Sequence, residues 1–297
     1  MGDSDPYGLD LQLALSVCYE LHYRGFVGVD ERWEWDPGVL ALRARLEETF
    51  LETIRVEVGD IDTGATAADE MAGLSVEPTD GDGPSYHLRD RGTWAQMREY
   101  FVHRSVYHLK EGDPHAWAIP RLSGNAKAAF VAVEFDEFGA GRGDRVHQHL
   151  YAELMDAADL DPTYLHYLDA VPAEALVAVN LMSLFGLHRD LRGAAIGHFA
   201  ATEITSSPGS RRLVEALTRF EAPEPCVHFY REHVEADAVH EQVVRSDVVG
   251  ELIAQEPHLE SDVVFGIRAF NLVEDRLAGH LMTCWQAGES SLRRPVS

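Results

Sequence analysis

The chain has few of the features that mark a disulfide-stapled, membrane-spanning or strand-rich protein. Its 297 residues include three widely spaced cysteines, and no two of them form a Cys-x-x-Cys pair. A disulfide framework and a cysteine-type zinc site are therefore not expected. The longest apolar stretch, residues 175–187, contains Asn180 and is too short to span a bilayer. Strand signals are also scarce, because no Asn-Gly turn joins two alternating runs.

Basic residues are scarce as well. The chain has 25 Lys and Arg against 50 Asp and Glu, a formal net charge of −25. Because phosphate binding needs clustered Lys and Arg, we expect neither nucleic acid nor an anionic membrane as a partner. The first residues contain no basic region followed by an apolar run, so no signal peptide is expected. Together with the unpaired cysteines, these features predict a cytoplasmic protein.

Apolar residues recur at helical spacing through most of the chain, which predicts an all-α fold. The expected helices cover residues 11–23, 37–54, 93–110, 125–138, 144–158, 172–185, 187–206, 210–220, 225–245 and 262–286. Thr93 and Asp144 are the expected N-terminal caps of two of them. Residues 60–85 are rich in Asp, Gly, Thr and Pro, which predicts an acidic linker or flap. We therefore expect an N-terminal helical arm and linker over residues 1–85 and a helical bundle over 86–297.

The most informative segment lies in the expected helix over residues 225–245. His233, Asp237 and His240 stand at positions i, i+4 and i+7, which places them within an arc of roughly 60° on one helical face. Two imidazoles and a carboxylate on one face suit a ferrous, manganous or zinc ion. Lone helical histidines are usually surface or core residues, but three good ligands in register predict a metal site.

A carboxylate farther upstream is a candidate to complete the site. Glu203 follows a small and apolar segment, and a carboxylate buried there would need a counter-charge or a metal ion. An ion pair with Arg192 or Arg211 is an equally good interpretation of Glu203 alone. His198 lies five residues earlier and faces another direction, so we interpret it as a structural residue or as a neighbour of the ligands.

Three further candidates lie in the middle of the chain. His147 aligns with the apolar stripe of its expected helix, whereas His149 faces away and is expected to be exposed. Ten residues before His147 is Glu137, and Glu134 shares its helical face, so spacing alone leaves the choice between these two open. Glu111 by itself is typical of a solvated helix end.

Other known motifs are weak or missing. The glycine cluster at residues 139–143 follows an expected helix rather than a strand, which disfavours a dinucleotide site. The chain contains no His-Glu-x-x-His zinc motif. It also contains none of the Glu-x-x-His repeats typical of ferritin-like di-iron bundles. The ligand pattern is therefore not that of these metalloprotein classes.

The pattern resembles the haem-oxygenase-like di-iron oxidases and oxygenases, also called iron-containing redox enzymes. In that family a histidine, a mid-chain carboxylate and a late His-x3-Asp-x2-His cluster bind two irons. The matching residues here are His147, Glu203 and the trio at 233, 237 and 240, separated by 56 and 30 residues. The resemblance covers roughly residues 90–245. It implies a haem-oxygenase-like bundle of about seven core helices, and it implies that Glu111 is an upstream ligand.

One subgroup is more similar to this chain. The N-oxygenases that form N-hydroxy, nitroso or nitro groups in natural-product biosynthesis carry an additional carboxylate ligand ten residues before the first histidine. Glu137 occupies that position here, so the resemblance favours it over Glu134. The full set of metal ligands that the resemblance implies is Glu111, Glu137, His147, Glu203, His233, Asp237 and His240, and Glu137 would also tune the reactivity of the centre.

The resemblance implies a non-haem di-iron N-oxygenase. Two ferrous ions would use O2 as co-substrate to oxidise a nitrogen of a small amine, guanidine or aminoimidazole. An external electron donor, either a reductase or a small-molecule reductant, would complete the reaction. Two alternatives stay open: oxidative decarboxylation or C–C cleavage of a fatty or amino acid, and a metal-free helical binding protein. A homodimer is a further prediction.

Overall fold

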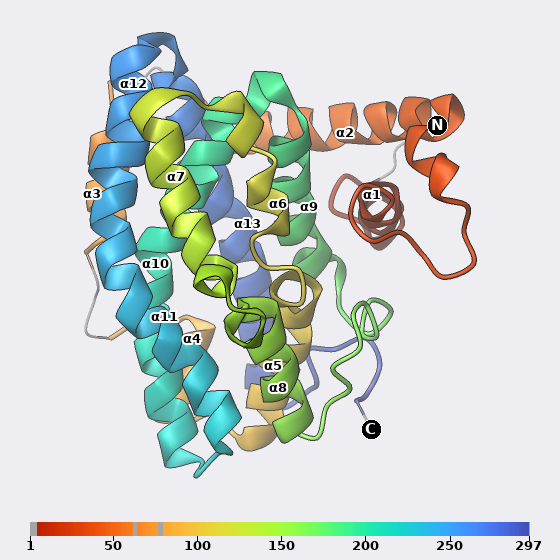
Figure 1. The fold of residues 1–297 in the computed structure, drawn as a ribbon. Helices are drawn as coiled ribbons and strands as arrows, with labels where there is room; N and C mark the ends of the chain where they lie inside the picture. Colours follow the sequence, from red (N-terminus) through yellow and green to blue (C-terminus); the bar gives the residue numbers. More distant parts are fainter. Residues whose placement is uncertain (1–4, 62–63, 77–79, 297) are drawn as a thin grey trace.

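The computed structural model describes residues 5–61, 64–76 and 80–296, without the side chains of residues 235–239. Within these ranges the chain forms helices and turns and no strand, which confirms the all-α prediction (Figure 1). None of the described helices combines the length and the apolar character needed to cross a membrane.

The long helices of the bundle come mainly from the second half of the chain. The α-helices are α1 (Leu9–Glu20), α2 (Pro37–Val58), α3 (Ala67–Leu74), α4 (Pro84–Asp90), α5 (Trp94–His108), α6 (Asp113–Ala116), α7 (Gly124–Glu137), α8 (His147–Ala157), α9 (Ala173–Leu187), α10 (Arg192–Arg219), α11 (Glu224–Val243), α12 (Glu251–Gln255) and α13 (Glu260–Ala287). A π-helical segment, Val244–Gly250, joins α11 to α12.

Helix α10 lies at the centre of the bundle, packed along α11 and α13 (Figure 1). Its close approach to α13 depends on Gly197, where an added Cβ would lie 2.0 Å from the Val263 carbonyl oxygen. No real side chain can occupy that distance, so the two backbones meet directly. The axis of α10, and with it the position of Glu203, is thereby held against α13.

Helices α1 and α2 form the N-terminal arm, which extends to one side of the bundle (Figure 1). Helix α1 packs on α9, and α2 packs on α13. The Asn180 side-chain amide donates hydrogen bonds to the backbone and side-chain oxygens of Gln12 at 2.8 and 2.9 Å. This contact explains a polar residue within the apolar stretch of α9. The division between residues 1–85 and 86–297 stays a prediction.

Part of the segment expected to be a linker is helical. Helix α3 begins after Thr66, whose hydroxyl accepts a hydrogen bond from the Asp69 amide, while the Asp69 carboxylate accepts one from the Thr66 amide. This capping box is a start signal that composition alone conceals. Ala67 and Met71 are buried against the bundle, so α3 belongs to the core.

Two expected helix boundaries are wrong. The chain runs as one helix, α10, through the region where two helices were expected, and Pro208 lies inside it. Proline removes one backbone hydrogen bond, but residues of α10 on both sides of Pro208 are buried in the hydrophobic core. Asp144 is not the cap of α8 either: it lies in a short turn beside Arg142, and α8 begins only at His147 after Val146.

Candidate metal centre

The turn between α7 and α8 brings a carboxylate and an imidazole together. Glu137 is the last residue of α7, and His147 is the first residue of α8. Gly139 has φ +69°, and a Cβ there would lie 2.7 Å from the Arg145 carbonyl carbon and the Val146 nitrogen. The turn can therefore double back tightly, and His147 Nδ1 lies 2.7 Å from Glu137 Oε2. Both side chains are buried.

Helix α11 supplies a second imidazole to the same place. His233 Nδ1 donates a hydrogen bond to the Phe229 carbonyl oxygen one turn earlier, at 2.8 Å. This bond sets the tautomer, because a carbonyl oxygen can only accept, and it leaves the Nε2 lone pair on the other side of the ring. His233 Nε2 lies 3.5 Å from Glu111 Oε1. The ring is thus oriented to offer Nε2 to a metal ion.

Two groups of potential ligand atoms result, and they overlap at one residue. The first set is Glu111, Glu137, His147 and His233, and the second set is Glu137, Glu203 and His240. Within each set the ligand atoms lie within 4.8 Å of one another, and every member is buried. Glu137 belongs to both sets, so its carboxylate could help to hold an ion in either.

His240 is oriented by a neighbour of Glu137. Its Nε2 lies 3.0 Å from Asp136 Oδ2, while its Nδ1 lies 3.2 Å from Glu203 Oε2. A hydrogen bond from Nε2–H to Asp136 would leave Nδ1 facing the second set. Metal-binding imidazoles characteristically donate their other N–H to a carboxylate in this way.

The electrostatics of the first set fit a cation. Among the described side chains, the ion pairs of Glu111 and Glu137 are made with imidazoles alone. Burial would raise the pKa of Glu111, but His108 and His233 outweigh it and hold that pKa well below its usual range. Glu111 Oε2 is buried and accepts no hydrogen bond from any residue that the structure describes. Carboxylates and imidazoles of this kind suit iron or another divalent metal.

Most of the residues expected as ligands converge. Glu111 is buried, so the interpretation of an isolated solvated helix end is wrong. Glu203 lies beside His240, and Arg192 pairs instead with Glu256. Asp237 belongs to α11, but its side chain lies outside the described part of the structure.

The positions of His147 and His149 agree with the expectation from the apolar stripe of their helix, which favoured His147 as the buried residue. His149 is exposed and lies 3.4 Å from Glu153, away from the ligands. That His147 and the other members of the two sets bind metal stays a prediction, because their convergence shows only that they could.

Three residues near the two sets were not among the ligands expected from the sequence. His108 and Asp136 were not considered, and Glu134 was considered but Glu137 was favoured over it. His108 Nδ1 lies 2.9 Å from Glu111 Oε1, at the helical spacing of three residues. Asp136 orients His240, as described above. Glu134 is buried, and its pKa is raised well above its usual range by burial and by nearby carboxylates, Glu137 first among them. Helical spacing is the signal that could have found them: it had already drawn attention to Glu134 beside Glu137, and the spacing between His108 and Glu111 could have done the same for His108.

A cavity of about 390 Å³ extends from the first set toward the surface. Glu111, His108 and His233 line its inner end. Its walls include the apolar side chains of Met182 and Phe270. The volume is within the range typical of small-molecule sites.

The outer part of this cavity is charged. Arg104 on α5 donates two hydrogen bonds to Glu274 on α13, at 3.0 and 2.7 Å. Arg212 and Asp275 also line this cavity. A molecule in the cavity would therefore meet charges of both signs as well as the buried ligands.

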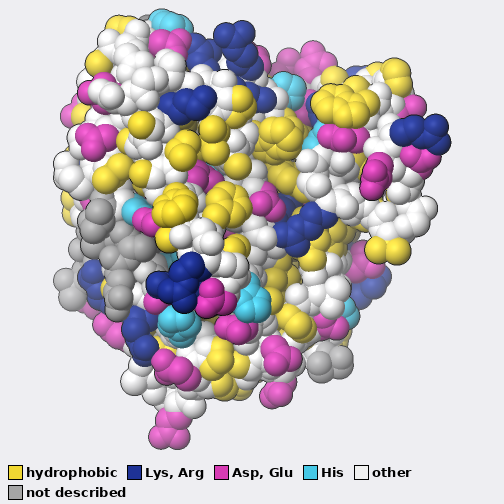
Figure 2. All heavy atoms as spheres, viewed as in Figure 1, with side chains coloured by type: hydrophobic (Ala, Val, Ile, Leu, Met, Phe, Trp, Pro, Cys, Tyr) yellow, Lys and Arg dark blue, Asp and Glu magenta, His cyan; other side chains and the backbone are white. Residues whose placement is uncertain are grey.

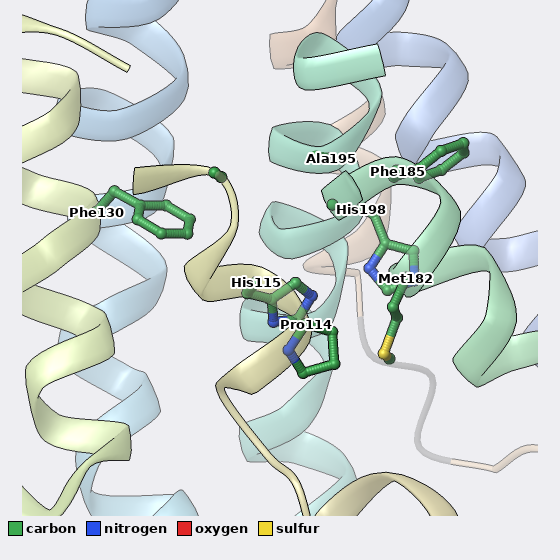
Figure 3. A pocket seen from close by; sticks show the side chains of 9 residues that line it. Pro114, His115, Phe130, Met182, Phe185, Ala195 and His198 are labelled. Atoms are coloured by element: carbon green, nitrogen blue, oxygen red, sulfur yellow. The ribbon is translucent and has the colours of Figure 1, made fainter. Parts of the chain in front are cut away.

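A second, much smaller cavity of about 10 Å³ lies between α6, α9 and α10. Figure 3 shows His115 and His198 among its lining side chains, and their ring centroids are 5.6 Å apart. Burial lowers the pKa of His115 to about 4 and that of His198 well below its usual value. Both rings are therefore neutral near pH 7, which fits the structural role expected for His198.

Comparison with known proteins gives two matches. The family described as iron-containing redox enzymes matches residues 98–275. The nitrosourea synthase of Streptomyces achromogenes subsp. streptozoticus is 22% identical over 185 residues, which cover 62% of this chain and 39% of that protein. This chain therefore spans well under half the length of that relative.

Proposed function

The chain belongs to the iron-containing redox enzyme family, with its haem-oxygenase-like all-α fold, and from this premise we propose that it is a di-iron N-oxygenase. The observation that carries the proposal is the pair of buried ligand sets sharing Glu137. Iron ions held by these two sets would supply the redox chemistry that the activation of O2 needs. The family makes the protein an oxidoreductase, and nitrogen oxidation is the finer step that we propose.

Two observations support oxidation at nitrogen rather than at carbon. Glu137 lies where N-oxygenases carry their additional ligand, and here it belongs to both sets. The similar protein named nitrosourea synthase forms, by its name, a compound in which nitrogen bears oxygen. We therefore propose a small amine, guanidine or aminoimidazole as substrate, within natural-product biosynthesis.

The proposed reaction balances with an external reductant. One oxygen atom of O2 is inserted into a substrate N–H bond to give N–OH, and the other leaves as water. Two electrons and two protons come from a reductase or a small-molecule reductant. Repeated rounds would carry the nitrogen toward a nitro group. Bound ferrous ions would supply the binding and reductive activation of O2, while the protein supplies position and environment.

The described residues account for that positioning. His108 and His233 line the inner end of the large cavity, so a substrate there lies beside the first set. Met182, Phe229 and Phe270 contribute apolar side chains to the walls of the same cavity. At the outer end, the Arg104–Glu274 ion pair offers hydrogen-bonding groups of both signs. A small molecule with both polar and apolar parts would fit these walls.

The proposal is tested on protein loaded with ferrous iron without oxygen. Amines, guanidines and aminoimidazoles are added with a reductant and isotopically labelled O2, and products are read by mass spectrometry. We expect two irons per chain and labelled oxygen on a substrate nitrogen. Glu137→Ala should abolish the product, whereas Glu153→Ala, at an exposed position on α8, should not.

Other outcomes would contradict the proposal. Release of carbon dioxide or of a cleaved carbon fragment from fatty or amino acids, without nitrogen oxidation, would favour the alternative oxidase chemistry. Failure of the wild-type protein to bind iron would favour a metal-free binding protein.

The homodimer and the cytoplasmic location also stay predictions. Figure 2 shows acidic side chains spread across the visible face, in keeping with the proposed absence of nucleic-acid and membrane partners.

A further inference from the structure

One buried carboxyl group, that of Glu134, lies beside the ligand sets. Glu134 is 2% exposed, and neither of its side-chain oxygens has a hydrogen-bond partner within the described part of the chain. Burying a carboxyl group, ionised or protonated, without a partner costs free energy. A position with this cost calls for a compensating contact.

Glu134 lies near two residues of the first set, although it is a member of neither set in the structure. It precedes Glu137 by three residues on α7, so the two carboxylates share one helical face. A Cβ added to Gly112 would lie 3.6 Å from Glu134 Oε2, which puts this oxygen next to the residue that follows Glu111. Its side chain also interacts electrostatically with the carboxylates of Glu137, Glu203, Asp113 and Glu111.

We propose that Glu134 is a further carboxylate ligand of the metal centre, on the ion held by Glu111 and His233. The proposal rests on the metal centre of the proposed function. A glutamate side chain has three rotatable bonds, so a small rotation can redirect its oxygens. Hard or borderline divalent cations favour carboxylate oxygens, and binding one would supply the contact that Glu134 otherwise lacks.

The test compares cobalt(II) binding to metal-free wild-type protein, to Glu134→Gln and to Glu47→Gln. Glu47 is a matched control, because it is also a buried carboxylate but pairs with Arg43 and His188. Loss of even an indirect partner of a metal ligand typically lowers affinity by about tenfold or more. We expect Glu134→Gln to lower the affinity for one of two cobalt ions by at least that factor. The visible absorption of that ion should also change, because fewer ligands surround the ion.

The outcomes separate this inference from the function on which it rests. Glu47→Gln should keep both the isotherm and the spectrum of the wild type. A Glu134→Gln isotherm and spectrum that superimpose on those of the wild type would overturn the role of Glu134 alone. Absence of cobalt binding by the wild type would instead overturn the metal centre. If Glu134→Gln does not fold, Glu134→Leu gives the same readout, since an apolar side chain suits the buried position.

Discussion

Removal of the Asp136 side chain should weaken the binding of one metal ion and leave the binding of the other unchanged. Asp136 Oδ2 lies 3.0 Å from His240 Nε2, and His240 belongs to the second set only. In Asp136→Ala the imidazole loses the partner that sets its tautomer and ring orientation, although both ligand sets keep all their members. The effect should therefore be confined to the ion held by Glu203 and His240.

The expected magnitude follows from the role of such partners. Mutation of a carboxylate that orients a metal-binding histidine costs about 10–100-fold in affinity, which corresponds to roughly 1.4–2.7 kcal/mol. Asp136 is 50% exposed, so solvent can replace part of the lost hydrogen bond. We therefore expect the lower end of this range, about tenfold. Asp136→Asn should have a smaller effect, because its side-chain oxygen can still accept from Nε2–H.

The assay is a titration of the metal-free protein with manganese(II), with free ion counted by electron paramagnetic resonance. His233→Ala identifies the binding step of the first set, and Asp136→Ala should leave that step unchanged. Asp156→Ala, which removes an exposed charge from α8, controls for the general loss of negative charge. Equal weakening of both steps by Asp136→Ala, or an equal effect of Asp156→Ala, would refute the reasoning.

Two further predictions concern the fold. Burial lowers the pKa of His103 to about 3, so at intermediate pH the unfolded chain takes up a proton that the folded protein does not. Stability should fall by about 2 kcal/mol from about pH 7.5 to pH 5 through this group, and urea unfolding should show that His103→Gln loses this part of the slope. Gly197→Ala should lower the free energy of unfolding by about 3 kcal/mol or more, because the added Cβ would meet the Val263 backbone. Gly279→Ala, with open space around it, should be neutral or stabilising in the same assay; equal effects of the two alanines would contradict the packing argument.

Local geometry explains which parts of the site could be predicted from sequence. The spacing of His233 and His240 depends only on helical periodicity, and both are buried within α11 or at its end. The stripe that separates His147 from His149 is local in the same sense. Such features follow from positions three, four or seven residues apart, and they need no knowledge of the neighbouring helices.

Features set by contacts between distant segments could not be predicted in this way. Glu111 has the sequence context of a helix end, yet α11 covers it and His233 lies 3.5 Å away. The continuity of α10 through Pro208 depends on its contacts with α11 and α13. Glu111 was named as a candidate ligand by the resemblance to a family and not by the spacing of residues. A family pattern reflects tertiary contacts, which spacing along one helix does not.

The last turn of α7 connects the two halves of the proposed centre. Glu137 belongs to both ligand sets, and Asp136 beside it orients His240 of the second set. The turn at Gly139 then brings His147 back to Glu137 at 2.7 Å. A displacement of this one turn would therefore move groups of both sets together. This arrangement gives a physical reason for the two ions, once bound, to react together, while the orientation of His240 by Asp136 acts on the second set alone.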